Sequence, residues 1–193
     1  MTYNLILAGV GGQGILSIAF VIDQASLAEG HYFLQAEVHG MSQRGGAVQS
    51  HLRLSDTKIY SPLIPQGEAD LILSVEPLEA LRYFSYLKPR GTVISSRSPY
   101  LNIPDYPPLE DIYREIKKVP SSLLLEADRL AKEAGSLRAE NMVVLGAASV
   151  FLPLKEENLK KFIEVLFRAK GEKVVNTNLK AFDLGRQAAT GEQ

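Results

Sequence analysis

Residues 4–14 read NLILAGVGGQG, an apolar run that leads directly into a glycine-rich loop. The apolar run is typical of a strand buried on both faces, and Gly9, Gly11 and Gly14 follow the G-x-G-x-x-G spacing. An amphipathic helix is expected next, because apolar residues recur on one helical face before Gly30 ends it; they are Ile15, Ile18, Ala19 and Ile22. Residues 32–38 favour a second strand, so this N-terminal segment predicts a β–α–β unit.

The rest of the chain alternates strands and helices in its first half and is rich in helices in its second. Strands are expected at 47–54, 69–75, 91–95 and 116–119, with a hairpin through Ser55 and Asp56 to a short strand at 58–60. Helices are expected at 77–87, at 121–134 capped by Ser121 or Ser122, at 142–152 capped by Asn141, at 159–167 and at 174–189. The proline-rich stretch 99–108 predicts a loop.

These patterns predict one α/β domain over residues 1–193. We expect a three-layer Rossmann-like fold whose sheet is mostly parallel, with an antiparallel hairpin and a helix-rich C-terminal half. That half is expected to cover one face of the sheet or to pack on another chain.

The composition excludes several classes of function. The chain has 193 residues, of which 46% are hydrophobic, a net charge of −1 and no cysteine. Balanced charge gives no attraction to nucleic acid or to a membrane surface, and neither a transmembrane run nor a signal peptide is recognisable. We therefore expect a cytoplasmic protein. The lack of thiols excludes disulfides, thiolate catalysis and cysteine-ligated iron–sulfur clusters in this chain.

The glycine loop has three possible roles. It could bind a nucleotide, but the acidic residue that holds a ribose about 20 residues further on is missing, since that position falls near His31 and Glu37 comes late. It could simply allow close packing of a strand and a helix. It could also serve an anionic ligand or a partner subunit through Gly12, Gln13 and the free N–H groups at the helix start.

A second polar loop follows the strand 32–38 and contains Glu37, His39, Ser42, Arg44, Gly45 and Gly46. If the strands are parallel, this loop, the glycine loop, residues 74–76 and residues 95–97 all converge at the carboxyl edge of the sheet. Arg44 would offer a cationic fork to phosphate or carboxylate there. Independent catalysis is not favoured, because no nucleophile accompanies His39 and Glu37, and the three histidines lack metal-ligand spacing.

Four motifs occur in an order that resembles a known family. They are residues 9–14 (GVGGQG), 37–46 (EVHGMSQRGG), 69–73 with 76–80 (ADLIL and EPLEA), and 141–147 (NMVVLGA). The chain resembles, over nearly its whole length, the gamma-type subunits of 2-oxoacid:ferredoxin oxidoreductases, and most closely the small (beta) subunit of the indolepyruvate type. The resemblance implies a single pyruvate/ketoisovalerate ferredoxin oxidoreductase gamma-type catalytic domain.

This resemblance implies a subunit of an enzyme complex. Such complexes decarboxylate a 2-oxoacid, here an arylpyruvate, reduce ferredoxin and form an acyl-CoA, and thiamine diphosphate carries the carbanion chemistry. Because this chain lacks cysteine and a Gly-Asp-Gly thiamine motif, thiamine diphosphate, magnesium and the 4Fe-4S clusters are expected on a larger catalytic alpha subunit. The isolated chain is expected to be inactive and could form homodimers through surfaces meant for the partner.

No catalytic or metal-binding residue is expected in this chain. The hypothesis for its own site is contact with coenzyme A phosphates or with the partner through Gly9, Gly11, Gly12, Gln13, Gly14, Glu37, His39, Ser42, Arg44, Gly45 and Gly46. The alternatives are a stand-alone nucleotide-binding oxidoreductase and a non-enzymatic module that binds coenzyme A or another anion.

Overall fold

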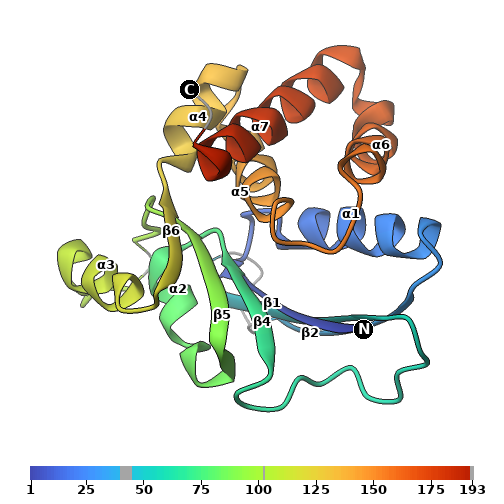
Figure 1. The fold of residues 1–193 in the computed structure, drawn as a ribbon. Coiled ribbons are helices and arrows are strands. Elements are labelled where there is room, and N and C mark those ends of the chain that lie inside the picture. The colour runs from blue at the N-terminus through green and yellow to red at the C-terminus, as the bar shows by residue number, and fades with distance from the viewer. Residues whose placement is uncertain (40–44, 102, 192–193) are drawn as a thin grey trace.

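The computed structural model describes residues 1–39, 45–101 and 103–191, which form a six-stranded sheet with helices on both faces (Figure 1). The strand order across the sheet is β2-β3-β1-β4-β5-β6. The strands are β1 (Thr2–Val10), β2 (Tyr32–His39), β3 (Ala47–Ser55), β4 (Ala69–Ser74), β5 (Leu87–Ser96) and β6 (Ser121–Leu125). The expected α/β class with a mainly parallel sheet is confirmed.

The antiparallel part of the sheet differs from the prediction. β1, β4, β5 and β6 are parallel neighbours, whereas β3 is antiparallel to both β1 and β2. Residues 58–60 form no strand, so the hairpin predicted there is wrong. The hairpin of the structure is instead formed by β2 and β3, and β3 is also antiparallel to β1. β2 still runs in the direction of β1, but β3 separates the two strands. The β–α–β unit therefore skips one position in the sheet.

Helices cover the two faces of the sheet unequally. α1, α4, α5, α6 and α7 lie on one face and α2 and α3 on the other (Figure 1). Their bounds are α1 (Ile15–Ala28), α2 (Pro77–Leu81), α3 (Leu109–Lys117), α4 (Ala127–Ala134), α5 (Glu140–Ala148), α6 (Glu156–Phe167) and α7 (Glu172–Thr190), with 3-10 turns at Phe84–Tyr86, Leu137–Ala139 and Arg168–Lys170. The C-terminal helices α4 to α7 thus cover one face of the sheet, which is one of the two arrangements expected from the sequence.

One predicted strand and two predicted helices differ from the structure. Residues 116–119 belong to the end of α3 and the turn after it, because Ile112 and Ile116 are buried one helical turn apart. Residues 121–125 form the edge strand β6, so the helix expected from Ser121 begins only at Ala127, although Gly135 ends it as predicted. The helix from Pro77 ends at Leu81 instead of Leu87, where β5 already begins.

The buried helix α5 packs closely against α7. A Cβ on Gly146 would lie 1.9 Å from the Phe182 carbonyl oxygen, and a Cβ on Gly185 would lie 1.9 Å from that of Val143. Both distances are far below contact, so the two backbones touch only because these residues are glycines. This contact attaches α7 to α5, and α5 in turn packs on β4 and β5 of the sheet.

The start of α6 is capped from the other end of the chain. Lys155 precedes the helix and makes no side-chain cap. Glu29, which follows α1, accepts hydrogen bonds through Oε1 from the Lys155 N–H (2.8 Å) and from Asn158 Nδ2 (2.9 Å). A carboxylate at a helix N-terminus also meets the positive end of the helix dipole. No helix in the described ranges is long and apolar enough to cross a membrane.

Candidate functional site

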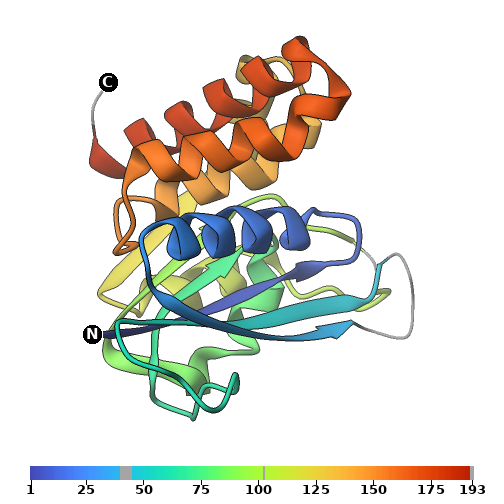
Figure 2. The ribbon, with the colours of Figure 1, turned by 90° about the vertical axis from the view of Figure 1, so that its right-hand side faces the viewer.

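The glycine loop joins β1 to α1 at the carboxyl edge of the sheet, the right-hand end of the molecule in Figure 2. Gly12 has φ +103° and Gly14 has φ +77°, so both occupy left-handed backbone conformations that favour glycine. A Cβ on Gly14 would lie 2.4 Å from Asn141 Nδ2, and one on Gly9 would lie 2.8 Å from Ile15 Cδ1. Close packing is therefore one role that these glycines fill.

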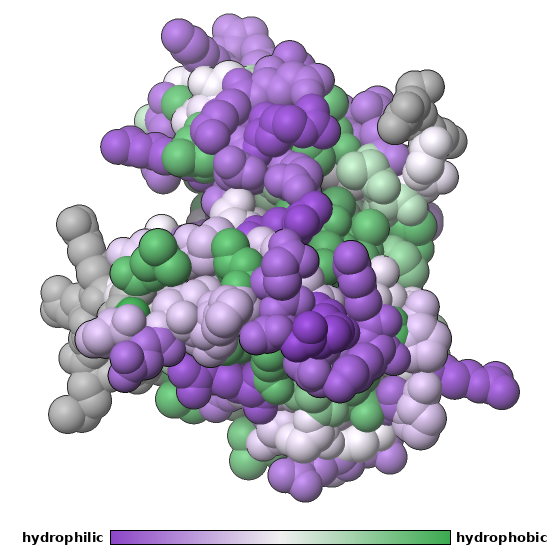
Figure 3. All heavy atoms as spheres, turned by 90° about the vertical axis from the view of Figure 1, so that its left-hand side faces the viewer, coloured by the Kyte–Doolittle hydropathy of each residue, from purple (hydrophilic) through white to green (hydrophobic). Residues whose placement is uncertain are grey.

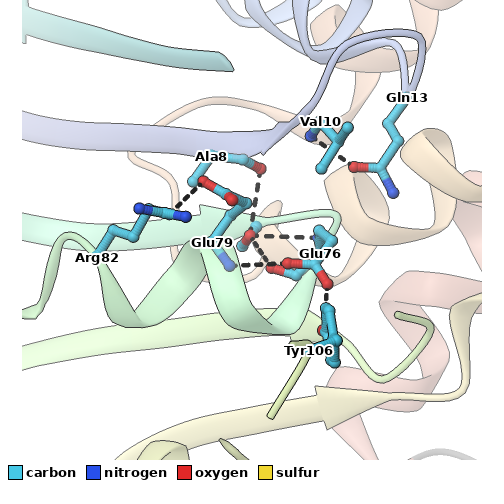
Figure 4. A network of polar contacts seen from close by, with 8 residues as sticks. Ala8, Val10, Gln13, Glu76, Glu79, Arg82 and Tyr106 are labelled. Carbon is cyan, nitrogen blue, oxygen red and sulfur yellow. Dashed lines mark hydrogen bonds and ion pairs between the residues drawn. The ribbon is translucent and has the colours of Figure 1, made fainter. Parts of the chain in front are cut away.

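Gln13 folds back and occupies the inside of the loop. Its Oε1 accepts a hydrogen bond from the Val10 N–H at 2.7 Å (Figure 4). Its Nε2 donates to the Val75 carbonyl at 3.4 Å. The N–H group at the start of the loop is thus used by the chain itself. Only the exposed outer side of the loop, at Gly12 and the first turn of α1, remains for an anion.

The second polar loop reaches the glycine loop. The Gly11 N–H donates to the Gly46 carbonyl at 2.9 Å, and the Gly45 N–H donates to the Gly11 carbonyl at 3.4 Å. This contact confirms that the two loops converge. Ser42 and Arg44 lie outside the described residues, so their part in the expected site stays a prediction.

Glu37 lies on β2 beside α1. Gln35 Nε2 donates to Glu37 Oε1, and the charge of Glu37 acts on Asp23 of α1. Burial first, and then this charge, raise the pKa of Asp23 to about 8. Because β3 separates β2 from β1, Glu37 is not placed next to the glycine loop as the ribose-binding acid of a dinucleotide fold would be. His39 is the last residue of β2.

The third segment at this edge is built around Glu76, whose side chain is 1% exposed. Ser74 Oγ donates to the Glu76 carbonyl at 2.5 Å and lies 3.2 Å from the Ala8 carbonyl of β1. Glu76 Oε2 caps α2 by accepting from the Glu79 N–H at 2.8 Å (Figure 4). Glu79 pairs with Arg82 at 3.0 Å on the far side of this short helix.

The fourth segment contains Arg97, which is held away from the glycine loop. Its guanidinium pairs with Glu126 at 2.8 Å and lies 4.7 Å from the centre of the Tyr113 ring. The residues after it turn back toward the edge of the sheet, where Ser98, Pro99 and Tyr100 line a cleft. All four predicted segments therefore end near one another, but Arg97 is committed to local contacts.

The cleft has a volume of about 920 Å³ and lies between the glycine loop and the helical layer. The face shown in Figure 3 is hollowed between that layer and the sheet layer, and mostly hydrophilic side chains cover the helices above the hollow. Its lower wall is formed by Gly12, Gln13, Gly14 and Ser17, and one side wall by residues 98–100. The start of α5 and the start of α7 form the upper walls.

Charged side chains are distributed unevenly around the cleft. Asp128 pairs with Lys132 at 3.1 Å, and Glu140 accepts a hydrogen bond from Ser96 Oγ at 2.7 Å. Burial raises the pKa of Glu140, whereas the hydrogen bond from Lys132 lowers the pKa of Asp128. For the other lining cations, Arg138, Lys170 and Lys173, the structure gives no carboxylate partner within the described ranges.

The three cations on the upper rim were not predicted from the sequence. Arg138 belongs to the 3-10 turn before α5, and Lys170 and Lys173 flank Gly171 at the end of one helix and the start of the next. No spacing rule connects Arg138 with Lys170 and Lys173, and only the packing of α7 on α5 brings them to the same cleft. Asn141 was expected to cap a helix that starts at Met142, but α5 already begins at Glu140. The Asn141 side chain instead donates from Nδ2 to the Gly14 carbonyl at 3.2 Å.

Comparison with known proteins agrees with this architecture. Residues 4–188 match the model of the family "Pyruvate ferredoxin/flavodoxin oxidoreductase". The chain is 41% identical, over 97% of its length and 96% of the relative's, to the indolepyruvate oxidoreductase subunit IorB of Pyrococcus horikoshii. The gamma subunit of a keto/oxoacid ferredoxin oxidoreductase from Geobacter sulfurreducens superposes with a TM-score of 0.69 at 25% identity, covering 98% of this chain and 99% of that one.

One longer protein of known structure contains this fold as one section of its chain. The 2-oxoglutarate:ferredoxin oxidoreductase of Magnetococcus marinus, solved with 2-oxoglutarate, coenzyme A and succinyl-CoA bound, superposes with a TM-score of 0.79 at 26% identity. The match covers 98% of this chain and 31% of that one, so the chain spans about a third of the neighbour's length. The chain therefore belongs to the pyruvate ferredoxin/flavodoxin oxidoreductase family, as an accessory, gamma-type subunit of 2-oxoacid:ferredoxin oxidoreductases.

Proposed function

We propose that this chain is the accessory subunit of an indolepyruvate-type enzyme. The reaction converts an arylpyruvate, coenzyme A and two oxidised ferredoxins into an aryl-acetyl-CoA, carbon dioxide, a proton and two reduced ferredoxins. The full-length identity of 41% to a small subunit with that activity in its name supports this substrate class over other 2-oxoacids. The cytoplasm is the proposed location.

The redox centres and thiamine diphosphate are assigned to a partner chain. Iron–sulfur clusters need thiolates, and this sequence contains no cysteine. Within the described ranges, no three histidine, aspartate or glutamate side chains gather as a metal site would require. The residues present thus do not fit an iron–sulfur cluster, and the sequence contains no Gly-Asp-Gly motif of the kind that binds magnesium and thiamine diphosphate. No step of the oxidation is therefore assigned to this chain.

The contribution of this chain is a binding cleft for coenzyme A. The observation that carries the assignment is a cleft of about 920 Å³ whose rim has three cations without a carboxylate partner in the described ranges. A ligand with several phosphate groups supplies the matching charge, and the cations can form charge-assisted hydrogen bonds with it. Arg138, Lys170 and Lys173 would hold the phosphates, and the outer side of the glycine loop would lie beside the rest of the molecule.

Calorimetric titration of the full chain with coenzyme A tests the cleft. We expect saturable binding that 3′,5′-ADP competes for, and at least tenfold weaker binding by the double variant Lys170→Glu with Lys173→Glu, which is about 1.4 kcal/mol. Lys117→Glu with Lys118→Glu, at the C-terminal end of α3, makes the same change of charge on the other face of the sheet and should bind as the wild type does. Equal weakening by both pairs would reject the cleft.

The activity itself is tested after co-expression with a cysteine-rich partner. We expect arylpyruvate-dependent and coenzyme A-dependent reduction of a viologen dye by the complex, and none by either chain alone. Dye reduction by the isolated, metal-free chain would overturn the assignment. A preference of the complex for branched-chain over aryl 2-oxoacids would overturn the substrate class but not the role of the subunit.

A further inference from the structure

Glu76 is a buried carboxylate that the proposed binding of coenzyme A does not use. Its side chain is only 1% exposed, and it lies between β4 and α2 at the carboxyl edge of the sheet (Figure 4). A carboxylate buried in this way is destabilising unless donors satisfy its oxygens. The partners of those oxygens therefore show what the residue does.

The donors come from two different segments. Oε2 accepts from the Glu79 N–H at 2.8 Å, which caps α2. Oε1 accepts from the Tyr106 hydroxyl and from the Tyr100 N–H, the latter at 3.3 Å. One oxygen atom thus holds both ends of the loop between Tyr100 and Tyr106. Burial, and then the hydrogen bond to Glu76, raise the pKa of Tyr106, so its hydroxyl stays protonated as a donor.

This loop continues directly from the side wall of the cleft. Tyr100 itself lines the cleft, together with Ser98 and Pro99. The wall is fixed on its other side, where the Ser98 N–H donates to Ser96 Oγ at 3.0 Å and Tyr113 Oη donates to the Arg97 carbonyl at 2.6 Å. Glu76 supplies the second attachment, at the Tyr100 N–H.

The position of Glu76 is in turn set by the strands below the glycine loop. Ser74 Oγ lies 3.2 Å from the Ala8 carbonyl of β1, donates to the Glu76 carbonyl at 2.5 Å and lies 3.3 Å from the Glu76 N–H. β1 ends two residues after Ala8, where the glycine loop begins. The two walls of the cleft, at residues 12–14 and 98–100, are therefore joined through β1, Ser74 and Glu76.

We propose that Glu76 is a positioning residue that holds the 98–100 wall at a fixed distance from the glycine loop, and so sets the width of the cleft for the ligand. For the identity of the ligand, this inference rests on the proposed function. The position of the 98–100 wall follows from the hydrogen bonds of Glu76 and does not depend on that function. Glu76 touches no ligand in this account and acts only through Tyr100 and Tyr106.

Two variants of Glu76 test the proposal. Glu76→Ala removes both acceptor oxygens, and Glu76→Gln leaves one, so a backbone N–H at Tyr100 or Glu79 loses its acceptor. In the full chain, we expect coenzyme A binding about tenfold weaker in Glu76→Ala and intermediate in Glu76→Gln. In the complex, the KM for coenzyme A should rise while kcat stays within about twofold.

Glu79→Ala is the matched control. Glu79 is also buried, lies in the short helix that Glu76 caps and pairs with Arg82. Among the described residues, its side chain makes no hydrogen bond or ion pair with the 98–100 wall. It should lower the unfolding midpoint as Glu76→Ala does and leave coenzyme A binding unchanged. Equal binding by wild type and Glu76→Ala, or equal weakening by both alanine variants, would overturn the proposal.

Hydrogen exchange at the Tyr100 amide separates this proposal from the proposed function. Glu76→Ala should accelerate that exchange at least tenfold relative to Glu79→Ala, whether or not the wild type binds coenzyme A. If the wild type fails to bind coenzyme A, the proposed function fails, and the exchange result still decides whether Glu76 holds the wall. Unchanged exchange at Tyr100 would reject it.

Discussion

The side-chain amide of Asn141 donates a hydrogen bond to the Gly14 carbonyl at 3.2 Å, across 127 positions of sequence. Asn141 is 5% exposed, and a Cβ on Gly14 would lie 2.4 Å from its Nδ2. The first turn of α5 and the end of the glycine loop thus fit together only because Gly14 has no side chain. Two of the motifs that carried the family resemblance form one structural unit.

Gly14→Ala should destabilise the protein by about 2–4 kcal/mol, because left-handed strain and a clash with Asn141 add. Gly12→Ala is the control, since Gly12 also has a positive φ but open space around its Cβ position, and it should cost about 1–2 kcal/mol. Urea unfolding measures both. The double variant Gly14→Ala with Asn141→Ala should be less destabilised than the sum of the single variants. Equal losses for Gly12→Ala and Gly14→Ala would contradict this account.

Gly146→Ala should cost about 3 kcal/mol or more, because its Cβ would lie 1.9 Å from the Phe182 carbonyl oxygen and force α5 away from α7. Thermal and urea unfolding of the variant measure the loss. Ala188→Gly is the control, because it exchanges alanine for glycine on the exposed side of α7. It should cost only about 1 kcal/mol of unfolding free energy. A Gly146→Ala protein as stable as the wild type would show that the helices can separate without penalty.

Protonation of His51 should loosen the segment between β3 and β4. Its Nδ1 accepts a hydrogen bond from the Ile64 N–H at 3.0 Å, and burial lowers the pKa of His51 below 6.5. The unfolded chain therefore binds a proton more readily than the folded one, so stability should fall as the pH drops below about 6.5.

Urea unfolding at pH 7.5 and pH 5.5 checks this expectation. His51→Gln should be less stable than the wild type at pH 7.5 and should lose less stability between the two values. His31→Gln is the control, because it replaces a histidine whose Nδ1 lies 3.1 Å from Asp56 Oδ1. This variant should still show the loss of stability on acidification that protonation of His51 causes. If His51→Gln loses as much stability on acidification as the wild type, the assignment to His51 is wrong.

Asp23→Asn should stabilise the protein at pH 8. Burial and the charge of Glu37 raise the pKa of Asp23 to about 8, against 3.8 for an unperturbed aspartate. The folded state therefore holds a proton that the unfolded state releases, and the contribution of this residue to stability declines as the pH rises from about 4 to 8.

The gain for Asp23→Asn should be on the order of 1 kcal/mol at pH 8 and absent near pH 4. Urea unfolding at the two pH values measures it. Glu37→Gln removes the neighbouring charge and should give a smaller gain of the same sign, because burial is the larger cause of the shift. A destabilised Asp23→Asn variant at pH 8 would contradict the assigned pKa.

Local patterns predicted the elements whose partners are close in sequence. The strand before the glycine loop, the helix ended by Gly30 and the helix ended by Gly135 follow from apolar periodicity and glycine signals. β6 was missed because Leu123 and Leu124 continue the apolar spacing of α4, whereas this segment pairs with β5 as a parallel strand. The place of β2 was missed for a similar reason, since nothing in residues 32–38 indicates that β3 intervenes.

The candidate site was predicted only in part. Glycine spacing located the loop at residues 9–14, and the parallel strands predicted that residues 45–46 and 74–76 would lie near it. The role of Gln13 depends on a side chain that folds back onto Val10, which spacing does not predict. The cations at the rim come from separate helices, so their convergence depends on helix packing rather than on any local motif.

The carboxylate of Glu29 gives the end of α1 a part in the stability of a helix 126 residues later. Before the two halves of the chain have met, the first turn of α6 has no acceptor at that position and should fray. We therefore expect the first turn of this helix to be completed late in folding, because it depends on long-range closure, and closing distant contacts slows folding. A fragment that ends before residue 155 would leave the same carboxylate exposed to solvent.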